Sequence, residues 1–460
     1  MKNKNNVAQA DAVMSPKQPA RETNLPFYLI LLYLFFEFGR PQALVAPLRH
    51  IPIPSLITAI LIVYLFTKAK VTLRDKLTMR FLLLLGLMLI HIPLAMNNYW
   101  AFQNFKGMSF NFIAFLSLVY FVNNEERFHK LVVAWTLINV FVGAVGFALG
   151  GMGAGGFLGD ENDLCLVLNM ALPFPFFLAL TSKKGSLKLL YLVISGFLLL
   201  AIIVTQSRGG FLGLVAVSAY CWGKSNKKLV SAVVVVILML VALMFAPASY
   251  WDEIRSIAQE GAEKNPSGTG AARLHQWRTG WIIFLNNPII GIGQGNFRWN
   301  VGRYEEAGKV PLFYYRSMAG REAHSMYFSL LPELGLIGIF LFGSMTLQAF
   351  LDMMRIRRSA LKKISALKEK GGAAGGLPYE SMAAAITASL IGYLTTGVFI
   401  SVLYYPCVWV MMGFALSLKR INDQKESIAV EPNPTPPKTR WRRQALSACG
   451  PKLMSMREGA

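Results

Sequence analysis

The chain has 460 residues, of which 54% are hydrophobic and only 15% charged, and it carries a formal net charge of +22. Soluble domains carry about 25% charged residues, so this composition excludes an ordinary soluble protein and favours one dissolved in lipid. The positive charge does not by itself indicate nucleic acid. Most of it lies between apolar runs and in the tail, where anionic lipid headgroups are the natural partners. We therefore expect membrane lipids, and no nucleic acid, among the partners.

Long apolar runs predict the membrane spans. A helix needs about 17 to 25 apolar residues to cross a bilayer, and uninterrupted apolar runs exclude the alternating strands of a barrel. The predicted spans are 25–44, 51–67, 79–96, 107–123, 130–149, 163–181, 187–205, 209–223, 229–246, 325–351, 381–399 and 402–418. We predict an all-α polytopic membrane protein with about 12 transmembrane helices.

Basic residues fall on alternate connections between these spans. They are concentrated at 68–80 and 355–370, and smaller groups follow the fourth, sixth and eighth spans, whereas 150–162 contains none. Because Lys and Arg favour cytoplasmic loops, we expect both termini in the cytoplasm and the long connection on the outer side of the membrane.

The chain divides into five predicted parts. Residues 1–24 are expected to be a disordered cytoplasmic N-terminus, and 25–246 hold spans one to nine. Residues 247–323 form one large outer loop, and 324–418 hold spans ten to twelve. Residues 419–460 are expected to be a disordered, basic cytoplasmic tail.

The outer loop contains one predicted helix and one glycine-rich turn. Residues 271–285 predict an amphipathic helix, which the Asn-Asn-Pro sequence at 286–288 ends. The three glycines of 291–295 then permit a tight path with positive φ back toward the membrane. The four cysteines show no ligand spacing, so we predict no zinc site, disulfide framework, metal or other cofactor.

Two arginines are candidates for holding an anion. Arg208 lies at the outer start of the eighth span beside Gly209 and Gly210, although arginines at helix ends often only extend toward the interface. Arg273 lies on the predicted helix 271–285, where it could equally be solvated. Two guanidinium groups converging on one anion would suit a phosphate or diphosphate, whose oxygens the planar fork binds bidentately.

His324 stands at the outer start of the tenth span, close to Arg321. Isolated histidines are usually structural, and we interpret the other four in this way. At a membrane boundary beside a cationic site, however, a near-neutral pKa suits proton abstraction. Neighbouring arginines would lower the pKa of His324 and keep the imidazole neutral.

Three further polar residues have a functional and a structural interpretation. Asp160 and Asn162 belong to an outer segment with three carboxylates, which could hold a metal, pair with the arginines or cap a helix. The lack of regular ligand spacing favours pairing or capping over metal. Glu333 is a carboxylate inside the tenth span, which makes it a functional candidate by position or a structural partner to another helix.

These elements, in this order, resemble the bacterial O-antigen ligase and O-antigen polymerase membrane proteins. The resemblance covers about residues 155–345. It rests on Asp160-Glu161-Asn162-Asp163, Ser207-Arg208-Gly209-Gly210, Arg273-Leu274-His275-Gln276-Trp277, Asn287-Pro288 with Gly291-Ile292-Gly293, and His324-Ser325 with Glu333-Leu334-Gly335. Family members often carry Asn where this chain has Ser325, and the N-terminal extension and basic tail are not family hallmarks.

The resemblance implies a metal-independent, inverting glycosyltransferase of the bacterial inner membrane that uses an undecaprenyl-diphosphate-linked glycan as donor on the periplasmic face. The two arginines that hold the donor diphosphate in the family would correspond to Arg208 and Arg273. The family's histidine, which deprotonates or positions the acceptor hydroxyl, would correspond to His324. Trp277 could stack on a sugar face or anchor the loop at the interface.

The resemblance leaves the acceptor open, because a glycan, the lipid A core or a protein hydroxyl would require the same chemistry. Ligase, polymerase and protein O-glycosylation therefore all stay possible. A different class, a transporter of a small anion, would carry charges deep in several spans and usually internal repeats. A structural or assembly protein would lack catalysis altogether. The charges here gather at one outer mouth, which favours the glycosyltransferase.

Overall fold

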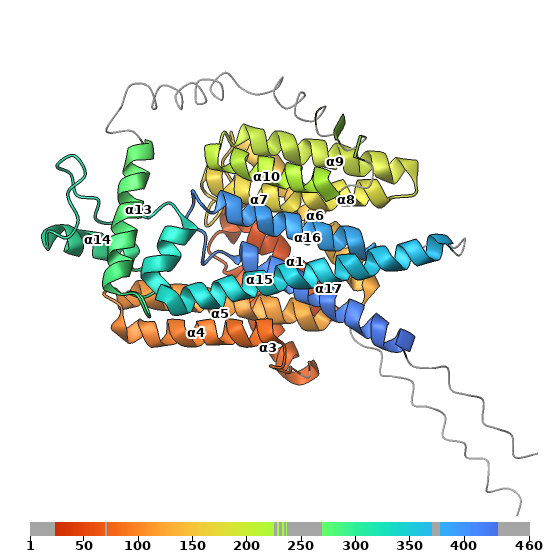
Figure 1. The fold of residues 1–460 in the computed structure, drawn as a ribbon, viewed down its shortest axis with the longest axis horizontal. Coiled ribbons are helices and arrows are strands. Elements are labelled where there is room, and N and C mark those ends of the chain that lie inside the picture. The colour runs from red at the N-terminus through yellow and green to blue at the C-terminus, as the bar shows by residue number, and fades with distance from the viewer. Residues whose placement is uncertain are drawn as a thin grey trace, which may run out of the picture.

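The structure is a computed structural model that describes residues 24–69, 71–224, 228–229, 232–233, 236, 269–369 and 378–430. The described residues form a bundle of helices, with two isolated β-bridges and no β-strand (Figure 1). Its elements are α1 (Leu25–Leu34), the π-helix η1 (Phe35–Gly39), α2 (Pro41–Leu44), the 3-10 helix η2 (Ala46–Leu48), α3 (Ile53–Lys68), α4 (Lys76–Leu94), α5 (Asn98–Phe121), α6 (Glu125–Ala148), α7 (Glu161–Ala171), α8 (Pro173–Thr181), α9 (Gly185–Val204), α10 (Arg208–Lys224), α13 (Thr269–Asn286), α14 (Phe297–Glu306), α15 (Met326–Glu369), α16 (Tyr379–Thr396) and α17 (Pro406–Val430).

Each predicted span coincides with one or more helical elements, apart from 229–246, which falls mostly outside the described residues. Five helical stretches are long and apolar enough to cross a membrane. They are Lys76–Leu94, Glu125–Ala148, Glu161–Thr181, Gly185–Val204 and Met326–Ala366. The all-α class and the apolar helices are confirmed for the described part of the chain. The count of about 12 spans and the large periplasmic loop stay predictions.

Helix α16 is the central helix of the bundle. It packs against α7, α8, α10, α15 and α17, and nearly all of its side chains are buried. A helix that is apolar on every side belongs in such a core. Neighbouring helices can approach the α16 backbone closely because its side chains are small at Ala383, Ala384, Ala385 and Ala388.

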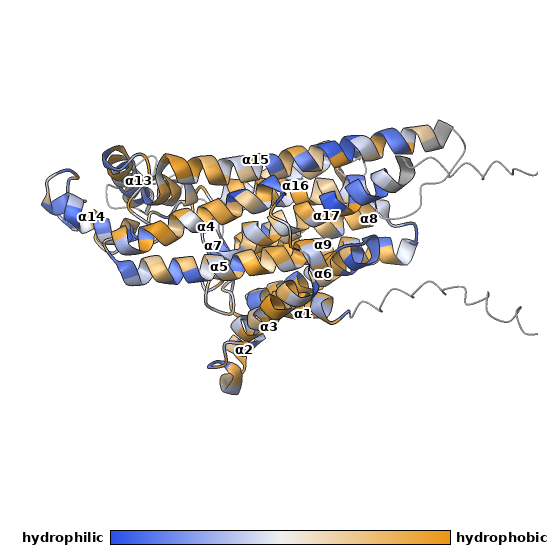
Figure 2. Ribbon diagram, turned by 90° about the horizontal axis from the view of Figure 1, so that it is seen from below, coloured by the Kyte–Doolittle hydropathy of each residue, from blue (hydrophilic) through white to orange (hydrophobic). Residues whose placement is uncertain are grey.

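Polar residues gather toward the ends of the bundle. Hydrophobic residues run along the lengths of the long helices in Figure 2, whereas α14 is mostly hydrophilic. Helices α13 and α14 lie at one end of the bundle, and the C-terminal ends of α15 and α17 lie at the other (Figure 1). The former, here called the α13–α14 end, carries the predicted site residues.

Helix α15 is interrupted at Gly335, about two and a half turns after its start at Met326. Gly335 has φ 60° and ψ −163°, a conformation essentially reserved for glycine, and Pro332 precedes it. The backbone groups freed by the break bond to the chain that follows α13. Ile292 N donates to Pro332 O at 2.9 Å, and Leu336 N donates to Pro288 O at 2.8 Å. The break is therefore closed by another segment rather than left unsatisfied.

The segment that closes the break, residues 288–295, is here called the glycine segment. Gly291, Gly293 and Gly295 have φ of 79°, 94° and 66°, so the predicted path with positive φ is confirmed. The approach is close: a Cβ on Gly335 would lie 2.5 Å from the carbonyl oxygen of Ile289. Only glycines fit at such a distance between two backbones.

Helix α17 extends well beyond the predicted end of the last span. It continues to Val430, so the prediction that 419–460 is disordered is wrong for 419–430. Residues 431–460, the predicted N-terminal tail up to residue 23, and 237–268 lie outside the described residues.

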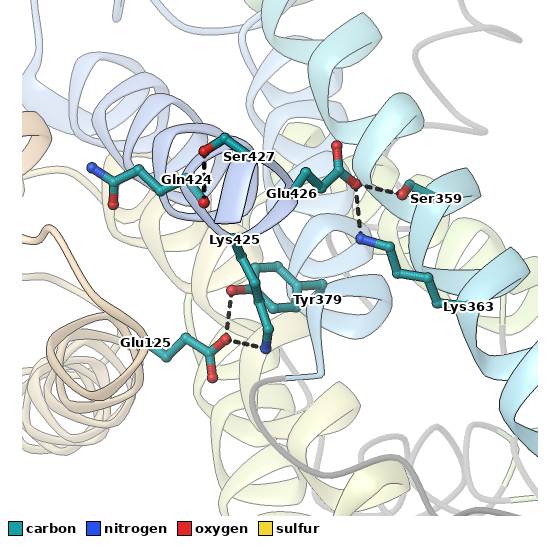
Figure 3. Close-up of polar contacts among 8 residues, drawn as sticks. All are labelled: Glu125, Ser359, Lys363, Tyr379, Gln424, Lys425, Glu426 and Ser427. Atoms are coloured by element: carbon teal, nitrogen blue, oxygen red, sulfur yellow. Dashed lines mark hydrogen bonds and ion pairs between the residues drawn. The ribbon is translucent and has the colours of Figure 1, made fainter. Parts of the chain in front are cut away.

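Ion pairs with other helices explain this extension (Figure 3). The Lys425 ammonium lies 2.6 Å from Glu125 of α6, which also accepts a hydrogen bond from the Tyr379 hydroxyl at 2.8 Å. The Glu426 carboxylate lies 2.9 Å from the Lys363 ammonium of α15. A span predicted from apolarity ends at the last apolar residue and takes no account of such polar tertiary contacts.

Candidate active site

A cavity of about 470 Å³ lies at the α13–α14 end and is here called the His324 cavity. Cavities of roughly this size hold small ligands or parts of larger ones. Its lining consists of Trp100, Asn104, Asp160, Glu161, Asn162, Asp163, Arg273, Gly295, Arg298, Glu322, His324, Ser329, Glu333, Phe399, Ile400, Ser401, Leu403, Tyr404 and Tyr405.

The cavity brings together most of the residues predicted from the sequence. Those in its lining are Asp160, Asn162, Arg273, His324 and Glu333. Arg208, Trp277 and Arg321 are not in the lining, although each lies on a segment that supports it. These segments come from chain positions far apart in the sequence, and the helix ends at this side of the bundle bring them together.

The acidic segment before α7 connects two helix starts. Asp160 caps α7, since its Oδ1 accepts hydrogen bonds from the backbone N and from Nδ2 of Asn162 at 2.8 and 2.7 Å. Oδ1 of Asn162 accepts a hydrogen bond from the Ser207 hydroxyl at 2.6 Å. Ser207 in turn accepts from Gly210 N at 2.9 Å and so caps α10. The geometry agrees with the capping interpretation of Asp160.

Arg208 is the first residue of α10, and the residues on either side of it contact residues that line the cavity. The preceding residue, Ser207, bonds the cavity residue Asn162. A Cβ on the following residue, Gly209, would lie 2.9 Å from Phe399, another cavity residue. The absence of a side chain at Gly209 therefore permits close packing of α10 against the α16–α17 connection. This packing accounts for a glycine at this position without a bound ligand.

Helix α13 matches the predicted helix 271–285 and ends at Asn286 as expected. Arg273 lies in its first turns, is half-buried and reaches the cavity. Within the described part of the chain it forms no ion pair. Its charge therefore faces the cavity without a fixed carboxylate partner.

Trp277, one turn after Arg273, supports the backbone beside His324. Its Nε1 donates to the carbonyl oxygen of Ala323 at 3.1 Å. One face of the indole stacks on Phe328, with ring centroids 5.2 Å apart and planes inclined by 8°. Because that face is covered, the geometry favours the structural interpretation of Trp277 over stacking on a sugar.

His324 adopts a conformation that is uncommon outside glycine, with φ 48°. Fixed neighbours hold it there: Trp277 bonds residue 323, and Met326 N donates to Gly397 O at 2.8 Å. The surrounding protein displaces water from the imidazole and lowers its pKa. The charges of Arg273 and Arg321 lower this pKa further, whereas that of Asp160 raises it. The predicted effect of the arginines is thus present, and His324 is neutral near pH 7.

Glu333 is almost completely buried, with 2% of its surface exposed. Its carboxylate accepts hydrogen bonds from Gly295 N at 2.8 Å, Phe297 N at 3.0 Å and the Tyr404 hydroxyl at 2.6 Å. It therefore holds the glycine segment and the start of α14 in place. These contacts account for a carboxylate at this depth and favour its structural interpretation.

Three residues of the cavity wall were missed in the sequence. Arg298 of α14 pairs with Glu322 at 3.2 Å and lies 5.8 Å from the ring centroid of Trp100. Partial burial raises the pKa of Glu322, although Arg298 pulls it down. The three come from distant parts of the chain, and no local spacing relates them. A tryptophan and a salt-bridged pair of arginine and glutamate occur at many surface positions, so the residue types gave no signal either.

The connection between α16 and α17 was also missed. Predicted spans at 381–399 and 402–418 left almost no loop between them, yet residues 399–405 contribute much of the lining. Pro406 at the start of α17, preceded by two tyrosines, is the one local signal that this connection is longer.

The described residues contain no group of three or more His, Cys, Asp or Glu side chains arranged to hold a metal. Cys165, Cys221 and Cys407 are buried free thiols, and Cys449 lies outside the described residues.

Residues 192–343 match the family model described as O-antigen ligase. The matched range runs from α9 into α15 and includes Arg208, Arg273 and His324. No curated protein matches the chain. Together with the apolar helices, the match indicates a bacterial membrane protein of polysaccharide or lipopolysaccharide biosynthesis with a glycosyl-transfer function. The match at residues 192–343 thus supports an O-antigen ligase assignment for this part of the chain.

Proposed function

We propose that the protein transfers a glycan from an undecaprenyl-diphosphate carrier to a hydroxyl acceptor in the His324 cavity. The observation that carries this proposal is the pairing of Arg273, a cation without a fixed carboxylate partner, with His324, a histidine whose lowered pKa keeps it neutral. One group suits an anionic leaving group and the other suits proton abstraction.

Four of the five carboxylates that line the cavity are engaged with groups other than Arg273. Asp160 caps α7, Glu161 accepts a hydrogen bond from Asn162 Nδ2 at 3.2 Å, Glu322 pairs with Arg298, and Glu333 accepts three hydrogen bonds. Arg273 is the cation left for the donor, and Arg208 lies between two residues that contact the cavity lining. Two guanidinium groups would bind the diphosphate oxygens and stabilise the charge that develops as it departs.

The transfer itself is a displacement at the anomeric carbon. The acceptor oxygen forms a bond to this carbon while the bond from the carbon to the phosphate oxygen breaks, and the configuration inverts. The hydroxyl proton passes to the neutral His324 imidazole, and the diphosphate leaves with the electron pair. In this proposal arginine charge takes the place of a divalent ion.

The wall formed by Trp100, Asn104 and Arg298 suits a sugar ring. An aromatic face packs against sugar C–H groups, and amide and guanidinium groups bond to hydroxyls. These wall residues would suit a glycan, the lipid A core or a protein hydroxyl as acceptor. They therefore do not distinguish a ligase from a polymerase.

The proposal places the site on the periplasmic face of the inner membrane, with both termini in the cytoplasm. The distribution of Lys and Arg supports this orientation, since the basic residues of 355–363 lie in the C-terminal part of α15, opposite the α13–α14 end.

Single substitutions test the mechanism. Arg273→Ala, Arg208→Ala and His324→Ala should each lower glycan transfer from the lipid-diphosphate donor by about 100- to 1000-fold, the range for removing one preorganised charge-stabilising or acid–base group. The assay uses purified full-length protein in lipid vesicles. Arg278→Ala, an exposed arginine of the same helix α13 that does not line the cavity, is the matched control. Unchanged turnover in all three variants, or an equal loss in the control, would refute the mechanism.

A further inference from the structure

A second cavity of about 570 Å³ lies beside the glycine segment, between the end of α4, the end of α13 and helix α14. It is here called the Lys309 cavity. It shares none of its lining residues with the His324 cavity, because Gly291 and Ile292 face this side while Gly295 faces the other.

The polar lining of this cavity is suited to an anion. It contains Arg303 and Lys309, together with three asparagines, and it contains no carboxylate. Lys309 Nζ donates to the side-chain oxygen of Asn286 at 3.1 Å and lies 5.3 Å from the ring centroid of Tyr304. These contacts orient the ammonium while leaving it donors to spare.

Glu305, the neighbour of the lining residue Tyr304 in the chain, is engaged elsewhere. It accepts hydrogen bonds from the Ser317 hydroxyl and from Met318 N at 2.9 Å. Its carboxylate is therefore committed to the chain that follows α14. The two cations of the cavity are free to bind phosphate oxygens, which guanidinium and ammonium groups bind with charge-assisted hydrogen bonds.

Exposed apolar side chains continue from the cavity along the bundle. Leu94 and Ile290 belong to the lining itself, and 63% and 39% of their surfaces are exposed. Ile289 is 63% exposed, and its carbonyl oxygen bonds Ile337 N of α15 at 3.2 Å. Phe340, one turn farther along α15, is 68% exposed. The end of α4 and the side of α15 thus form an apolar belt that begins at the mouth of the cavity.

We propose that the Lys309 cavity binds the phosphate headgroup of a membrane lipid whose acyl chains lie on this apolar belt. A free phosphate would account for Arg303 and Lys309 but not for the belt next to them. An uncharged lipid would account for the belt but not for two cations without a carboxylate. A phosphorylated lipid accounts for both the two cations and the apolar belt, as expected for a cationic pocket at a membrane boundary. The site does not depend on the proposed glycosyl transfer.

Lipid retention by the full-length protein tests this proposal. The purified protein is mixed with phosphatidic acid or with diacylglycerol of the same chains, and bound lipid is counted by native mass spectrometry. The wild type should retain phosphatidic acid in preference to diacylglycerol. The double variant Arg303→Gln/Lys309→Gln should retain about 30-fold less phosphatidic acid. Each basic residue near a membrane surface raises the affinity for an anionic lipid about fivefold.

Arg316→Gln provides the matched control, because Arg316 is exposed and lies in neither cavity. It should retain phosphatidic acid as the wild type does. Equal retention of both lipids, an equal loss in Arg316→Gln, or no loss in the double variant would each overturn the proposal. Displacement of phosphatidic acid by inorganic phosphate at equal concentration would overturn the assignment to a lipid and leave a site for a free anion. A thermal unfolding midpoint matching the wild type shows that the double variant is folded.

Discussion

The His324 cavity and the Lys309 cavity lie on either side of the same short glycine segment, yet their linings differ in charge. The first contains five carboxylates, Asp160, Glu161, Asp163, Glu322 and Glu333. The second contains none. Helix α14 contributes to both, with Arg298 on one side and Arg303 on the other. Five residues of an α-helix rotate by about 140° beyond a full turn, so the two arginines point to opposite sides.

This difference shows how one backbone arrangement can border two cavities that suit different ligands. The break in α15 and the glycine segment that closes it form a wall in which two backbones approach closely at Gly291 and Gly335. The wall fixes where the two cavities lie, and the helices around it decide what each can bind. Substitutions in the wall should therefore affect both cavities, whereas substitutions on the surrounding helices should affect one.

Gly335→Ala is expected to have the largest effect, because it acts on the shared wall. Its φ and ψ are strained for any residue with a side chain, at a cost of about 1–3 kcal/mol, and the new Cβ would lie 2.5 Å from the Ile289 carbonyl oxygen. We expect a lower thermal unfolding midpoint together with loss of glycan transfer and of lipid retention. Gly343→Ala is the control on the same helix, since a Cβ there meets nothing within 4 Å. A Gly335→Ala protein with normal stability and both activities would show that the wall is not shared.

Glu333 substitutions come next and act mainly on the His324 side of the wall. Glu333→Ala would leave the buried N–H groups of Gly295 and Phe297 without an acceptor, which costs about 1–3 kcal/mol for each group. Glu333→Gln offers one acceptor oxygen and should lose less. If the role is structural, the unfolding midpoint and glycan transfer fall together across the two variants. A Glu333→Gln protein with normal stability but without transfer would instead indicate a direct chemical role.

Arg298→Gln separates the two cavities. It removes the cation beside Trp100 and leaves the Glu322 carboxylate unpaired. Loss of one charge-assisted contact of about 1.5–3 kcal/mol should lower kcat/KM for glycan transfer by about tenfold or more, while phosphatidic acid retention stays at the wild-type level. Arg316→Gln serves again as control. Equal losses in transfer and in lipid retention would mean that the cavities are not independent.

Local signals predicted the helices well but not how they meet. The lengths of the apolar runs predicted α4, α6, α9 and α15, and the Asn-Asn-Pro sequence predicted the end of α13. The positive φ of the glycines was predictable, since such spacing is typical of a tight turn. That this turn fills a break in α15 was not, because the bonds join residues about forty positions apart.

The same limit applies to the site. Arg273 and His324 were identifiable because each is an ionisable residue at a boundary where such residues are uncommon. Arg298, Glu322 and Trp100 were not, because their meaning depends on mutual contacts that no spacing encodes. The helical end of the predicted tail was missed for a related reason, since Lys425 and Glu426 find their partners on other helices.

The smallest expected effect concerns the acidity of His324. The proposed mechanism needs the neutral imidazole, so kcat/KM should be constant near pH 7 and fall only as the pH drops through the pKa of His324, which lies below the ordinary value of 6.5. Arg321→Gln removes a charge that lowers this pKa. The acid limb should therefore move to higher pH, by about 0.3 pH units for a charge acting over roughly 10 Å of water-like medium.

Asp160→Asn should move the same limb in the opposite direction, because the Asp160 charge raises the pKa of His324. Asn keeps a side-chain oxygen that can cap α7, so the stability should change little. Measuring kcat/KM from pH 5 to 8 for both variants gives two shifts of opposite sign. Such a pair cannot arise from a general loss of stability, which would lower the plateau in both variants. Shifts of the same sign, or none, would show that another group controls the acid limb.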